Sequence, residues 1–252
     1  MRLDRISEME DYILQHRTVS LTELASHFSI SLNTVRRDVR ELIARGKVSK
    51  VYGGVSATES ILPLPLTERK VKNRAEKQII GQLASTLVQD NSTIFLDSGS
   101  TTPYILPHIA EKENVTIVTY SLNIMYEAAK YPSLSIYSLG GMFNHITGSY
   151  ISRSNELLNI IHPNTFFMAA SAVSLEFGLS NNVYDEFLIK EKIAHQNENI
   201  ILMADHTKFD SMATYTFCRF SNLAAIVTDS VPPKHYVDAM RSKGMVLYCP
   251  EV

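Results

Sequence analysis

Seven short apolar segments alternate with stretches of helical periodicity between residues 93 and 248, and this alternation constrains the fold more than any other feature of the chain. Strands are predicted at residues 93–96, 115–118, 134–139, 165–169, 200–204, 224–228 and 245–248, and helices near residues 76–88, 103–112, 122–130, 150–161, 184–197 and 233–242. Pro107 is expected to kink the second of these helices. The region is therefore predicted to be a mostly parallel α/β sheet with helices on both faces.

The turn after the first predicted strand is the most informative strand end, because ligands bind beyond the carboxyl ends of strands in such sheets. It reads Asp97-Ser98-Gly99-Ser100-Thr101-Thr102 and precedes Pro103, a residue favoured at the first position of a helix. Hydroxyls beside a helix N-terminus can donate to a phosphate, although the same residues could form an ordinary capped turn. Because no Walker lysine is present, a nucleoside triphosphate is not expected.

Three further strand ends could contribute to the same ligand site. Thr119 and Tyr120 follow the second strand, Gly140 and Gly141 follow the third, and Asp205 and Lys208 follow the fifth. A lysine in this position can pair with a phosphate or a sugar carbonyl oxygen, although Lys208 taken alone is an ordinary surface lysine. Together with the hydroxyl-rich turn, these residues favour a small anionic ligand.

The first 57 residues have the pattern of a winged helix-turn-helix, a small DNA-binding domain. A helix is predicted over residues 2–16, and Ser20 with Glu23 forms a capping box at the start of a second helix. After a turn at residues 29–31, Ser31 caps a third helix, whose inward residues are Val35, Val39, Leu42 and Ile43. A basic hairpin that ends in Gly53-Gly54 follows as the wing.

The outward face of the third helix is predicted to contact DNA. It carries Asn33, Thr34, Arg36, Arg37 and Arg40, and the hairpin adds Lys47 and Lys50 along the phosphates. Arginine pairs with guanine edges and asparagine with adenine edges in the major groove. A charged helix face is often only a solvated surface, but the compact triple of helices and the hairpin favour DNA binding. Asp38 and Glu41 are expected to form internal ion pairs.

Charge is distributed unevenly along the chain. The formal net charge is −2, whereas residues 31–55 contain six basic and two acidic residues, a local charge of +4. Neutralisation of phosphates supplies much of the affinity of proteins for DNA, so this patch suits the predicted head. The expected organisation is a DNA-binding domain at 1–57, a proline-containing linker at 58–75 and an effector-binding domain at 76–252. The basic residues at 69–77 are more typical of a solvated helix face than of further DNA contacts.

Other classes are not favoured by the composition. The two cysteines, Cys218 and Cys249, are far apart, which argues against a disulfide framework and a thiolate metal site. The longest apolar run, near residues 166–173, is much shorter than the ~20 residues that cross a bilayer. A soluble cytoplasmic protein without membrane contact, cofactor or metal is expected.

The stretch VSLTELASHFSISLNTVRRDVRELIARGKVSKVYGGV resembles the DNA-binding domain of the DeoR family of bacterial repressors. The family pattern T-[IV]-R-R-D is present as Thr34-Val35-Arg36-Arg37-Asp38, and the terminal His-Gly-Gly corresponds to Tyr52-Gly53-Gly54. The resemblance implies a contact from the wing tip by Tyr52. The opening RISEMEDYIL is similar to the inositol-catabolism repressors within this family.

The resemblance continues through the second domain. LDSGSTT, VTYSL, LGG and LMADHTKF are similar to the family's L-D-S-G-T-T, V-T-N-S-L, L-G-G and L-A-D-H-S-K-F. Ser100 replaces a threonine and keeps the hydroxyl, whereas Tyr120 replaces an asparagine and adds bulk. The family's second domain is similar to sugar-phosphate isomerases of the ribose-5-phosphate type, which implies a phosphorylated sugar as effector.

These observations favour a ligand-controlled repressor that binds a double-stranded DNA operator as a homodimer or homotetramer. The alternative is a sugar-phosphate isomerase-like enzyme, which needs a carboxylate base and a proton shuttle; Asp97 and Asp205 with Lys208 are conceivable parts. No catalytic signature supports that alternative, so a regulator is preferred. The predicted effector-binding residues are Asp97, Ser98, Gly99, Ser100, Thr101, Thr102, Thr119, Tyr120, Gly140, Gly141, Asp205 and Lys208.

Overall fold

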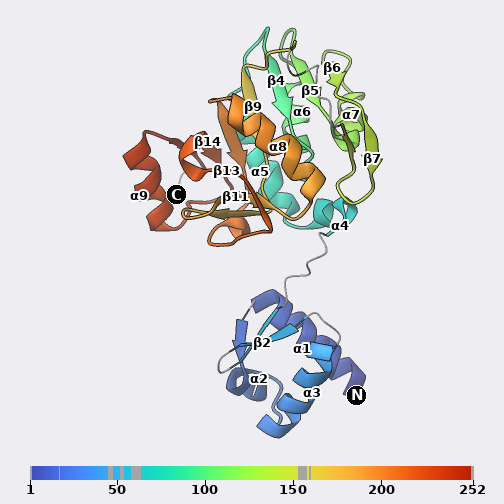
Figure 1. The fold of residues 1–252 in the computed structure, drawn as a ribbon, viewed down its shortest axis with the longest axis vertical. Helices are drawn as coiled ribbons and strands as arrows, with labels where there is room; N and C mark the ends of the chain where they lie inside the picture. The colour runs from blue at the N-terminus through green and yellow to red at the C-terminus, as the bar shows by residue number, and fades with distance from the viewer. Residues whose placement is uncertain are drawn as a thin grey trace. The chain divides into compact units, whose positions relative to one another are not determined.

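The computed structural model describes residues 2–16, 18–44, 48–51, 54–57, 64–152, 158 and 160–250 (Figure 1). The chain divides into two compact units, Met1–Leu62 and Pro63–Val252. In the part of the chain that the structure describes, no helix is long and apolar enough to cross a membrane.

The first unit is a three-helix domain with a small antiparallel sheet. It contains α1 (Arg2–His16), β1 (Thr18–Ser20), α2 (Leu21–His27), α3 (Leu32–Ala44), β2 (Val48–Val51) and β3 (Gly54–Ala57). The strands lie in the order β1-β3-β2. The three predicted helices and the hairpin are confirmed, and β1 was not predicted. A Cβ atom on Gly54 would lie 2.3 Å from the Val19 carbonyl oxygen, so a glycine lets β3 approach β1.

The second unit is built on a seven-stranded sheet in which every neighbouring pair is parallel. Its strands are β4 (Thr93–Leu96), β5 (Thr116–Thr119), β6 (Ser135–Ser138), β9 (Thr165–Met168), β12 (Ile200–Met203), β14 (Leu223–Val227) and β15 (Val246–Tyr248). They lie in the order β15-β14-β12-β9-β4-β5-β6. All seven predicted strands are therefore confirmed. The chain winds outward from β4 in one direction and from β9 in the other, which makes the β4/β9 boundary the topological switch point.

Helices cover both faces of this sheet, as predicted. The helices α5 (Arg74–Ser85), α6 (Leu106–Ile109) and α7 (Leu122–Ala128) share one apolar core with sheet residues such as Ile94 and Leu96. The helices α8 (Tyr184–Gln196) and α9 (Lys234–Lys243) share the other core with Phe95 on the opposite face of β4. The helix predicted at 103–112 is a 3-10 turn, η1 (Thr102–Ile105), followed by α6. Pro107 lies in the first turn of α6, where its missing N–H has no helical partner to lose.

The helix predicted at 150–161 is wrong at its start. Residues Ser149–Ile151 form β8, which pairs with β7 (Met142–Asn144) in a hairpin. Gly148, at a φ of +64°, supplies the left-handed residue that this turn requires. Residues 153–157 and 159 of the predicted helix lie outside the described residues.

Several short elements were not predicted. The strands β10 (Ala172–Ser174), β11 (Gly178–Asn181) and β13 (Tyr215–Cys218) form a separate sheet in the order β10-β11-β13. The remaining elements are α4 (Leu66–Val71), η3 (His206–Lys208) and η4 (Phe220–Asn222). Helix α4 lies within residues 58–75, which were expected to be a linker, and its Leu66 side chain is buried in the second unit.

Candidate DNA-binding and effector sites

Helix α3 presents the predicted polar face to solvent. Asn33, Arg36, Arg37 and Arg40 are exposed and Thr34 is half-buried, whereas the opposite face contributes Val35, Val39 and Leu42 to the core. Ser31 caps the helix as predicted, because its Oγ accepts a hydrogen bond from the Thr34 amide at 3.2 Å. The face can therefore supply four donor side chains of the kinds that recognise base edges and phosphates.

Asp38 fixes α3 against α1. Its carboxylate is fully buried, and its Oδ2 accepts hydrogen bonds from Arg5 Nε at 3.0 Å and Arg5 Nη2 at 2.8 Å. A planar guanidinium that bonds twice to a carboxylate restricts the relative rotation of the two helices. The internal ion pair predicted for Asp38 is confirmed. Arg37 remains on the surface, with its Nε 3.7 Å from Asp38 Oδ1.

The wing is described in part. Lys50 is an exposed residue of β2, which pairs with β3 from Val48 to Val51. Two of the predicted wing contacts, Lys47 and Tyr52, lie outside the described residues, as does Gly53.

In the second unit, the turn after β4 is organised by a buried ion-pair network. Asp97 Oδ2 lies 2.8 Å from Lys190 Nζ, and the two side chains are 0% and 2% exposed. Asp97 also accepts hydrogen bonds from the Gly99 amide at 2.9 Å and from the Ala169 amide at 2.8 Å. Because Ala169 directly follows β9, Asp97 connects the two strands that flank the switch point. A Cβ atom on Gly99 would lie 2.4 Å from the Ala169 Cβ, so the turn tolerates only glycine at this position.

Helix α8 supplies the rest of this network. Lys190 Nζ donates to the Ala169 carbonyl oxygen at 2.7 Å and lies 3.3 Å from Glu186 Oε1, which also accepts a hydrogen bond from Ser98 Oγ at 3.0 Å. Burial lowers the pKa of Lys190, but the charges of Asp97 and Glu186 outweigh burial and hold that pKa above its ordinary value. Sequence reasoning missed both α8 residues. Their i, i+4 spacing on the face of Ile189 and Ile193 could have indicated a buried pair.

The hydroxyls of this turn have different environments. Thr102 Oγ1 donates to the Asp97 carbonyl oxygen at 3.0 Å, and Thr119 Oγ1 donates to the Leu96 carbonyl oxygen at 2.7 Å. The Thr102 hydroxyl therefore closes the turn itself, and the Thr119 hydroxyl, at the end of β5, joins that strand to β4. Ser100 and Thr101 are buried, and within the described residues their hydroxyls form no such bond.

Tyr120, which occupies the position of an asparagine in the family pattern, is fully buried after β5. Its ring packs against Phe95 with centroids 6.0 Å apart. Its hydroxyl has no hydrogen-bond partner of normal geometry among the described residues, although Ser98 lies near enough to influence it. Burial, with the nearby charges of Glu186 and Asp97, raises the pKa of this phenol well above its ordinary value.

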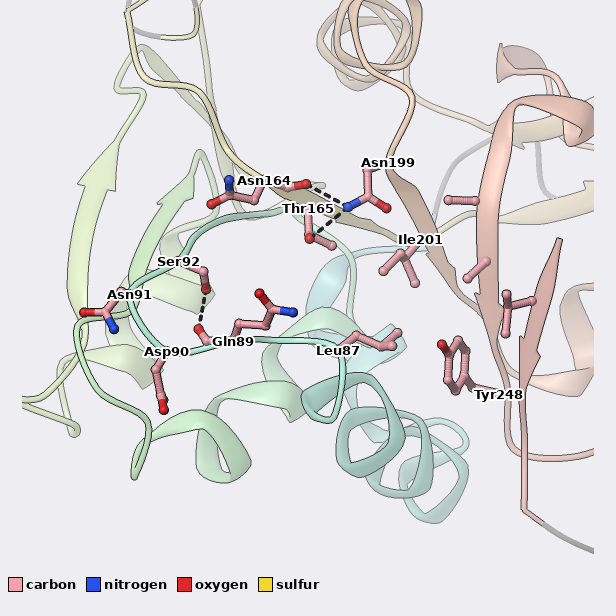
Figure 2. A pocket seen from close by; sticks show the side chains of 13 residues that line it. Leu87, Gln89, Asp90, Asn91, Ser92, Asn164, Thr165, Asn199, Ile201 and Tyr248 are labelled. Atoms are coloured by element: carbon pink, nitrogen blue, oxygen red, sulfur yellow. Dashed lines mark hydrogen bonds between the residues drawn. The ribbon is translucent and has the colours of Figure 1, made fainter. Parts of the chain in front are cut away.

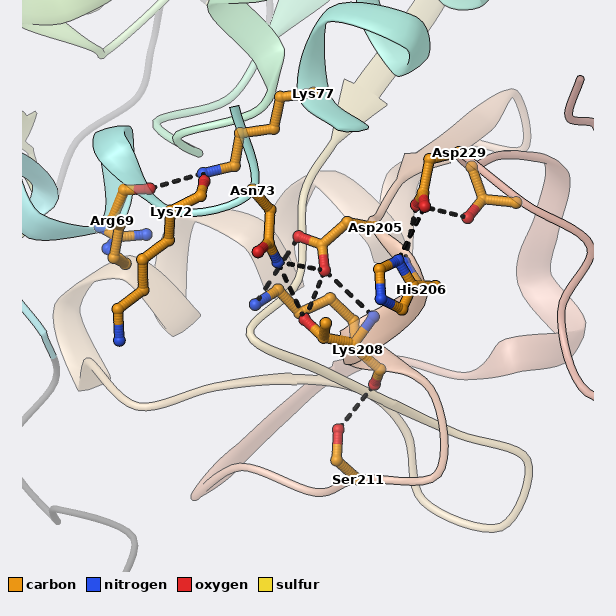
Figure 3. A network of polar contacts seen from close by, with 11 residues as sticks. Arg69, Lys72, Asn73, Lys77, Asp205, His206, Lys208, Ser211 and Asp229 are labelled. Carbon is orange, nitrogen blue, oxygen red and sulfur yellow. Dashed lines mark hydrogen bonds and ion pairs between the residues drawn. The ribbon is translucent and has the colours of Figure 1, made fainter. Parts of the chain in front are cut away.

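Asp205 and Lys208 lie together after β12, with Lys208 Nζ 3.8 Å from Asp205 Oδ2 (Figure 3). Asp205 is buried and accepts hydrogen bonds through Oδ1 from the Thr207 amide at 3.1 Å, the Thr207 hydroxyl and Asn73 Nδ2 at 3.0 Å. Lys208 has a side chain that is 33% exposed. The predicted lysine can therefore turn its ammonium toward a ligand while Asp205 stays fixed.

A second lysine, which sequence reasoning assigned to a solvated helix face, lies beside this group. Lys77 is 3% exposed and donates to the carbonyl oxygens of Arg69 at 2.5 Å and Lys72 at 2.7 Å (Figure 3). Burial lowers the pKa of Lys77 to about 8. The charge of Asp205 opposes this lowering, and the charge of Lys208 adds to it.

The predicted residues are only partly brought together. The turns after β4 and β5 are neighbours, and Asp205 lies two strands from β4. Gly140 and Gly141 follow β6, which β5, β4 and β9 separate from β12, a span of roughly 19 Å at ordinary strand spacing. Both glycines have positive φ, and a Cβ on Gly141 would lie 2.3 Å from the Ile151 carbonyl oxygen. Their position is explained by the β7–β8 hairpin, and the structure does not bring them next to Lys208.

A hollow of about 470 Å³ opens at the opposite, amino-terminal edge of the sheet (Figure 2). Several of its polar side chains bond to the protein: Asn199 Nδ2 donates to the Asn164 carbonyl oxygen at 2.7 Å, and Ser92 Oγ donates to the Gln89 carbonyl oxygen at 2.5 Å. It contains none of the predicted effector residues. Within the described residues, no group of three or more His, Cys, Asp or Glu side chains could hold a metal ion.

The fold and these sites define a class: a winged helix-turn-helix head in one chain with a parallel α/β domain whose polar residues gather at the carboxyl ends of its strands. Comparison with known families identifies the chain within that class. Residues 5–61 match the DeoR-like helix-turn-helix domain and residues 72–230 match the DeoR C-terminal sensor domain. The chain belongs to the DeoR family of DNA-binding transcriptional regulators, and it is a regulator rather than an enzyme.

Relatives support this assignment along most of the chain. The chain is 38% identical to the HTH-type transcriptional regulator IolR of Bacillus subtilis, over 90% of this chain and 91% of that protein. It is 26% identical to the glycerol-3-phosphate regulon repressor of Escherichia coli, over 88% of this chain and 89% of that protein. Ribose 5-phosphate isomerase A from Neisseria gonorrhoeae overlaps 54% of this chain and 53% of its own at 19% identity and a TM-score of 0.40, and the fold assignment rests instead on the sheet described above.

Proposed function

We propose that this regulator represses a sugar or polyol catabolic operon and leaves its operator when a phosphorylated sugar binds the second unit. The observation that carries the proposal is the partly exposed ammonium of Lys208 beside the buried carboxylate of Asp205, at the edge of the sheet where such folds bind ligands. The similarity to the glycerol-3-phosphate regulon repressor, which is named for a phosphorylated polyol, supports this class of ligand.

The proposed site residues are those predicted from the sequence. On DNA they are Ser31, Asn33, Thr34, Arg36, Arg37, Arg40, Lys47, Lys50 and Tyr52. For the effector they are Asp97, Ser98, Gly99, Ser100, Thr101, Thr102, Thr119, Tyr120, Gly140, Gly141, Asp205 and Lys208. The contacts of Thr102 and Thr119 with carbonyl oxygens favour a role in shaping the site, whereas Ser100, Thr101 and Lys208 are the stronger candidates for direct contact with a phosphate.

The proposed active species is a homodimer or homotetramer in the cytoplasm, where operator DNA is found. The local charge of +4 over residues 31–55 suits a head that neutralises few phosphates and binds weakly alone. Two heads on successive turns of one face of the duplex would multiply their affinities. The domain division at residues 57 and 75 remains part of this proposal, with α4 inside the connecting stretch.

The test is a gel shift with the DNA upstream of the chain's own gene, with and without a panel of phosphorylated sugars and phosphorylated intermediates of inositol breakdown. A member of the panel is expected to release the wild-type chain. Lys208→Ala should bind the DNA as tightly as wild type and no longer respond. A response that persists in this variant would remove Lys208 from the site, and release by an unphosphorylated sugar alone would exclude the phosphate.

A further inference from the structure

We propose that Asn73 connects the effector site to α4, the helix with which the described part of the second unit begins, so that a ligand held by Lys208 changes the state of α4. This inference rests on the proposed function, because it takes Asp205 and Lys208 as part of the effector site. Asn73 is then a positioning residue and does not itself contact the ligand.

The side chain of Asn73 bonds to Asp205 and does not cap the helix that begins after it. Asn73 stands at the N-cap of α5, a position that asparagine favours because its side chain can accept from the helix amides, yet it forms no such bond. Its Nδ2 donates instead to Asp205 Oδ1 at 3.0 Å and approaches Thr207 Oγ1 at 3.4 Å (Figure 3). Its φ of +50° is a left-handed conformation, which asparagine adopts more readily than most other residues with a side chain. The hydrogen bond to Asp205 joins Asn73 to a residue 132 positions away in the sequence.

The other end of α4 is also attached to the carboxyl edge of the sheet. The Leu66 amide donates to the Ile146 carbonyl oxygen at 2.9 Å, and the Leu66 side chain packs on Gly148, where a Cβ would lie 2.5 Å from Leu66 Cδ2. Gly148 in turn accepts a hydrogen bond from the Leu122 amide at 3.1 Å, directly after β5. Helix α4 is therefore attached to the β7–β8 hairpin at its first residue, and the chain just beyond its last residue is attached to Asp205 through Asn73.

A ligand anion would alter the contacts of Asp205. Lys208 Nζ lies 3.8 Å from Asp205 Oδ2, and that oxygen has no hydrogen-bond donor among the described residues. If Lys208 turns to a phosphate, Asp205 loses its nearest cation and gains a negative neighbour, which changes how strongly its other oxygen holds Asn73. The Lys77 amide donates to the Asn73 carbonyl oxygen at 3.1 Å, and Lys77 Nζ donates to the carbonyl oxygens of Arg69 and Lys72, so a change at Asn73 is passed to the last turn of α4. The ligand thus favours one state of α4 over another, which is what control of a linked head requires.

The test uses the full-length chain with inorganic phosphate as the probe of the anion site. Binding is measured by calorimetry, and the state of α4 by hydrogen exchange of the amides of residues 66–71. Three chains are compared: wild type, Asn73→Gly and the matched control Asn114→Gly. Asn114 also has a left-handed φ, of +52°, and one side-chain hydrogen bond, to Asn91, at the opposite edge of the sheet. Lys208→Met defines which binding belongs to the proposed site.

Phosphate is expected to change α4 exchange by about tenfold in wild type and in Asn114→Gly, the effect of one hydrogen bond to a charged group. Asn73→Gly should bind phosphate with a similar Kd and show no change in α4 exchange. Asn73→Asp, which keeps the backbone conformation and places a like charge beside Asp205, should also lose the change, and it serves if the glycine variant does not fold.

The possible failures are distinguishable. An α4 response in Asn73→Gly equal to that of wild type would overturn the inference and leave the proposed function standing, as would phosphate binding to wild type without any change in α4. If wild type shows no binding that depends on Lys208, the proposed effector site is wrong, and the inference is overturned with it.

Discussion

Lys190 and Asp97 form an ion pair with 2.8 Å between Nζ and Oδ2, and it joins α8 to the switch point of the sheet. Glu186 lies 3.3 Å from the same ammonium, so one cation serves two buried carboxylates. Charges with so little access to water are stable only when they are paired and hydrogen-bonded. The turn after β4 is therefore fixed by ion pairs with α8.

Lys190→Met is expected to lower the free energy of unfolding by about 3–5 kcal/mol, because it leaves two buried carboxylates without a cation. Urea unfolding of the full-length chain measures the change. Lys192→Met, a half-buried lysine on the same helix, is the control and should change the free energy of unfolding by less than about 0.5 kcal/mol. Equal effects of the two substitutions would show that the ion pair contributes nothing specific.

The same network predicts a pH dependence. Burial raises the pKa of Glu186, but the charges of Lys190 and Arg69 and the hydrogen bond from Ser98 outweigh burial and hold that pKa below its ordinary value. Since the folded pKa is the lower one, the stabilisation is complete above the unfolded pKa of about 4.3 and is lost as the pH falls through the folded pKa. Glu186→Gln should therefore lose less stability than wild type between about pH 5 and pH 3.

Unfolding by urea at a series of acidic pH values tests this prediction. Glu191→Gln, a half-buried glutamate on the same helix, is the control and should keep the wild-type slope. A Glu186→Gln chain with the wild-type slope over this range would assign the acid sensitivity to other carboxylates.

Much of the fold was predictable because local patterns determine it. Each of the seven sheet strands is a short apolar run bounded by turn residues, and the strands of a parallel sheet are buried on both faces. The strands β10, β11 and β13 were missed because they are three or four residues long and β11 pairs across a long interval, Leu179 with Cys218. Residues 150 and 151 were placed in a helix because nothing local marks the hairpin except Gly148.

The site was predictable to a different extent. Asp97 and Lys208 could be placed after strands because the ends of parallel strands can be read from the strand pattern, and their role in ligand binding stays a prediction. Their partners were not predicted. Lys190 contacts Asp97 and Asn73 contacts Asp205, and the spacing of these residues in the sequence does not indicate either contact. Buried charge pairs and crossing hydrogen bonds depend on packing, which one sequence without relatives does not reveal.

Tyr120→Phe is expected to leave the stability of the chain unchanged or to raise it. The buried hydroxyl has no partner of normal geometry among the described residues, and burying an unpaired hydroxyl costs about 1–3 kcal/mol. Tyr236→Phe is the matched control, because its hydroxyl donates to the Val173 carbonyl oxygen at 2.9 Å and accepts from the Asp210 amide at 3.0 Å. The control should lose about 1 kcal/mol.

Effector binding by the two variants tests whether the Tyr120 hydroxyl contacts the ligand. If the Tyr120 hydroxyl is kept for the effector, Tyr120→Phe should weaken effector binding while it maintains stability, a trade between activity and stability that is common at binding sites. Thermal unfolding and effector titration of the two variants separate the effects. A loss of stability in Tyr120→Phe as large as that in Tyr236→Phe would mean that its hydroxyl is paired within the protein.

The DNA-binding domain is predicted to make two kinds of DNA contact, which differ in how strongly their affinity depends on salt concentration. Arg36 and Arg37 lie on the exposed face of α3, whereas Lys50 lies on the wing strand β2. Arg36→Ala and Arg37→Ala should each weaken binding to the operator by about 1–3 kcal/mol and reduce the preference for it over unrelated DNA. Lys50→Ala should weaken binding to both DNAs alike and reduce the slope of log K against log salt by about 1.

Fluorescence titrations of operator and unrelated duplexes at four salt concentrations measure both quantities. The reason for the contrast is that a phosphate contact releases a counterion without reading sequence, whereas a base contact discriminates between sequences. Arg241→Ala, an exposed arginine of α9 in the second unit, is the control and should change neither quantity. If Arg36→Ala and Lys50→Ala both reduced affinity without any loss of sequence preference, α3 would be a backbone-binding helix, and the base-reading face would have to be sought elsewhere on the head.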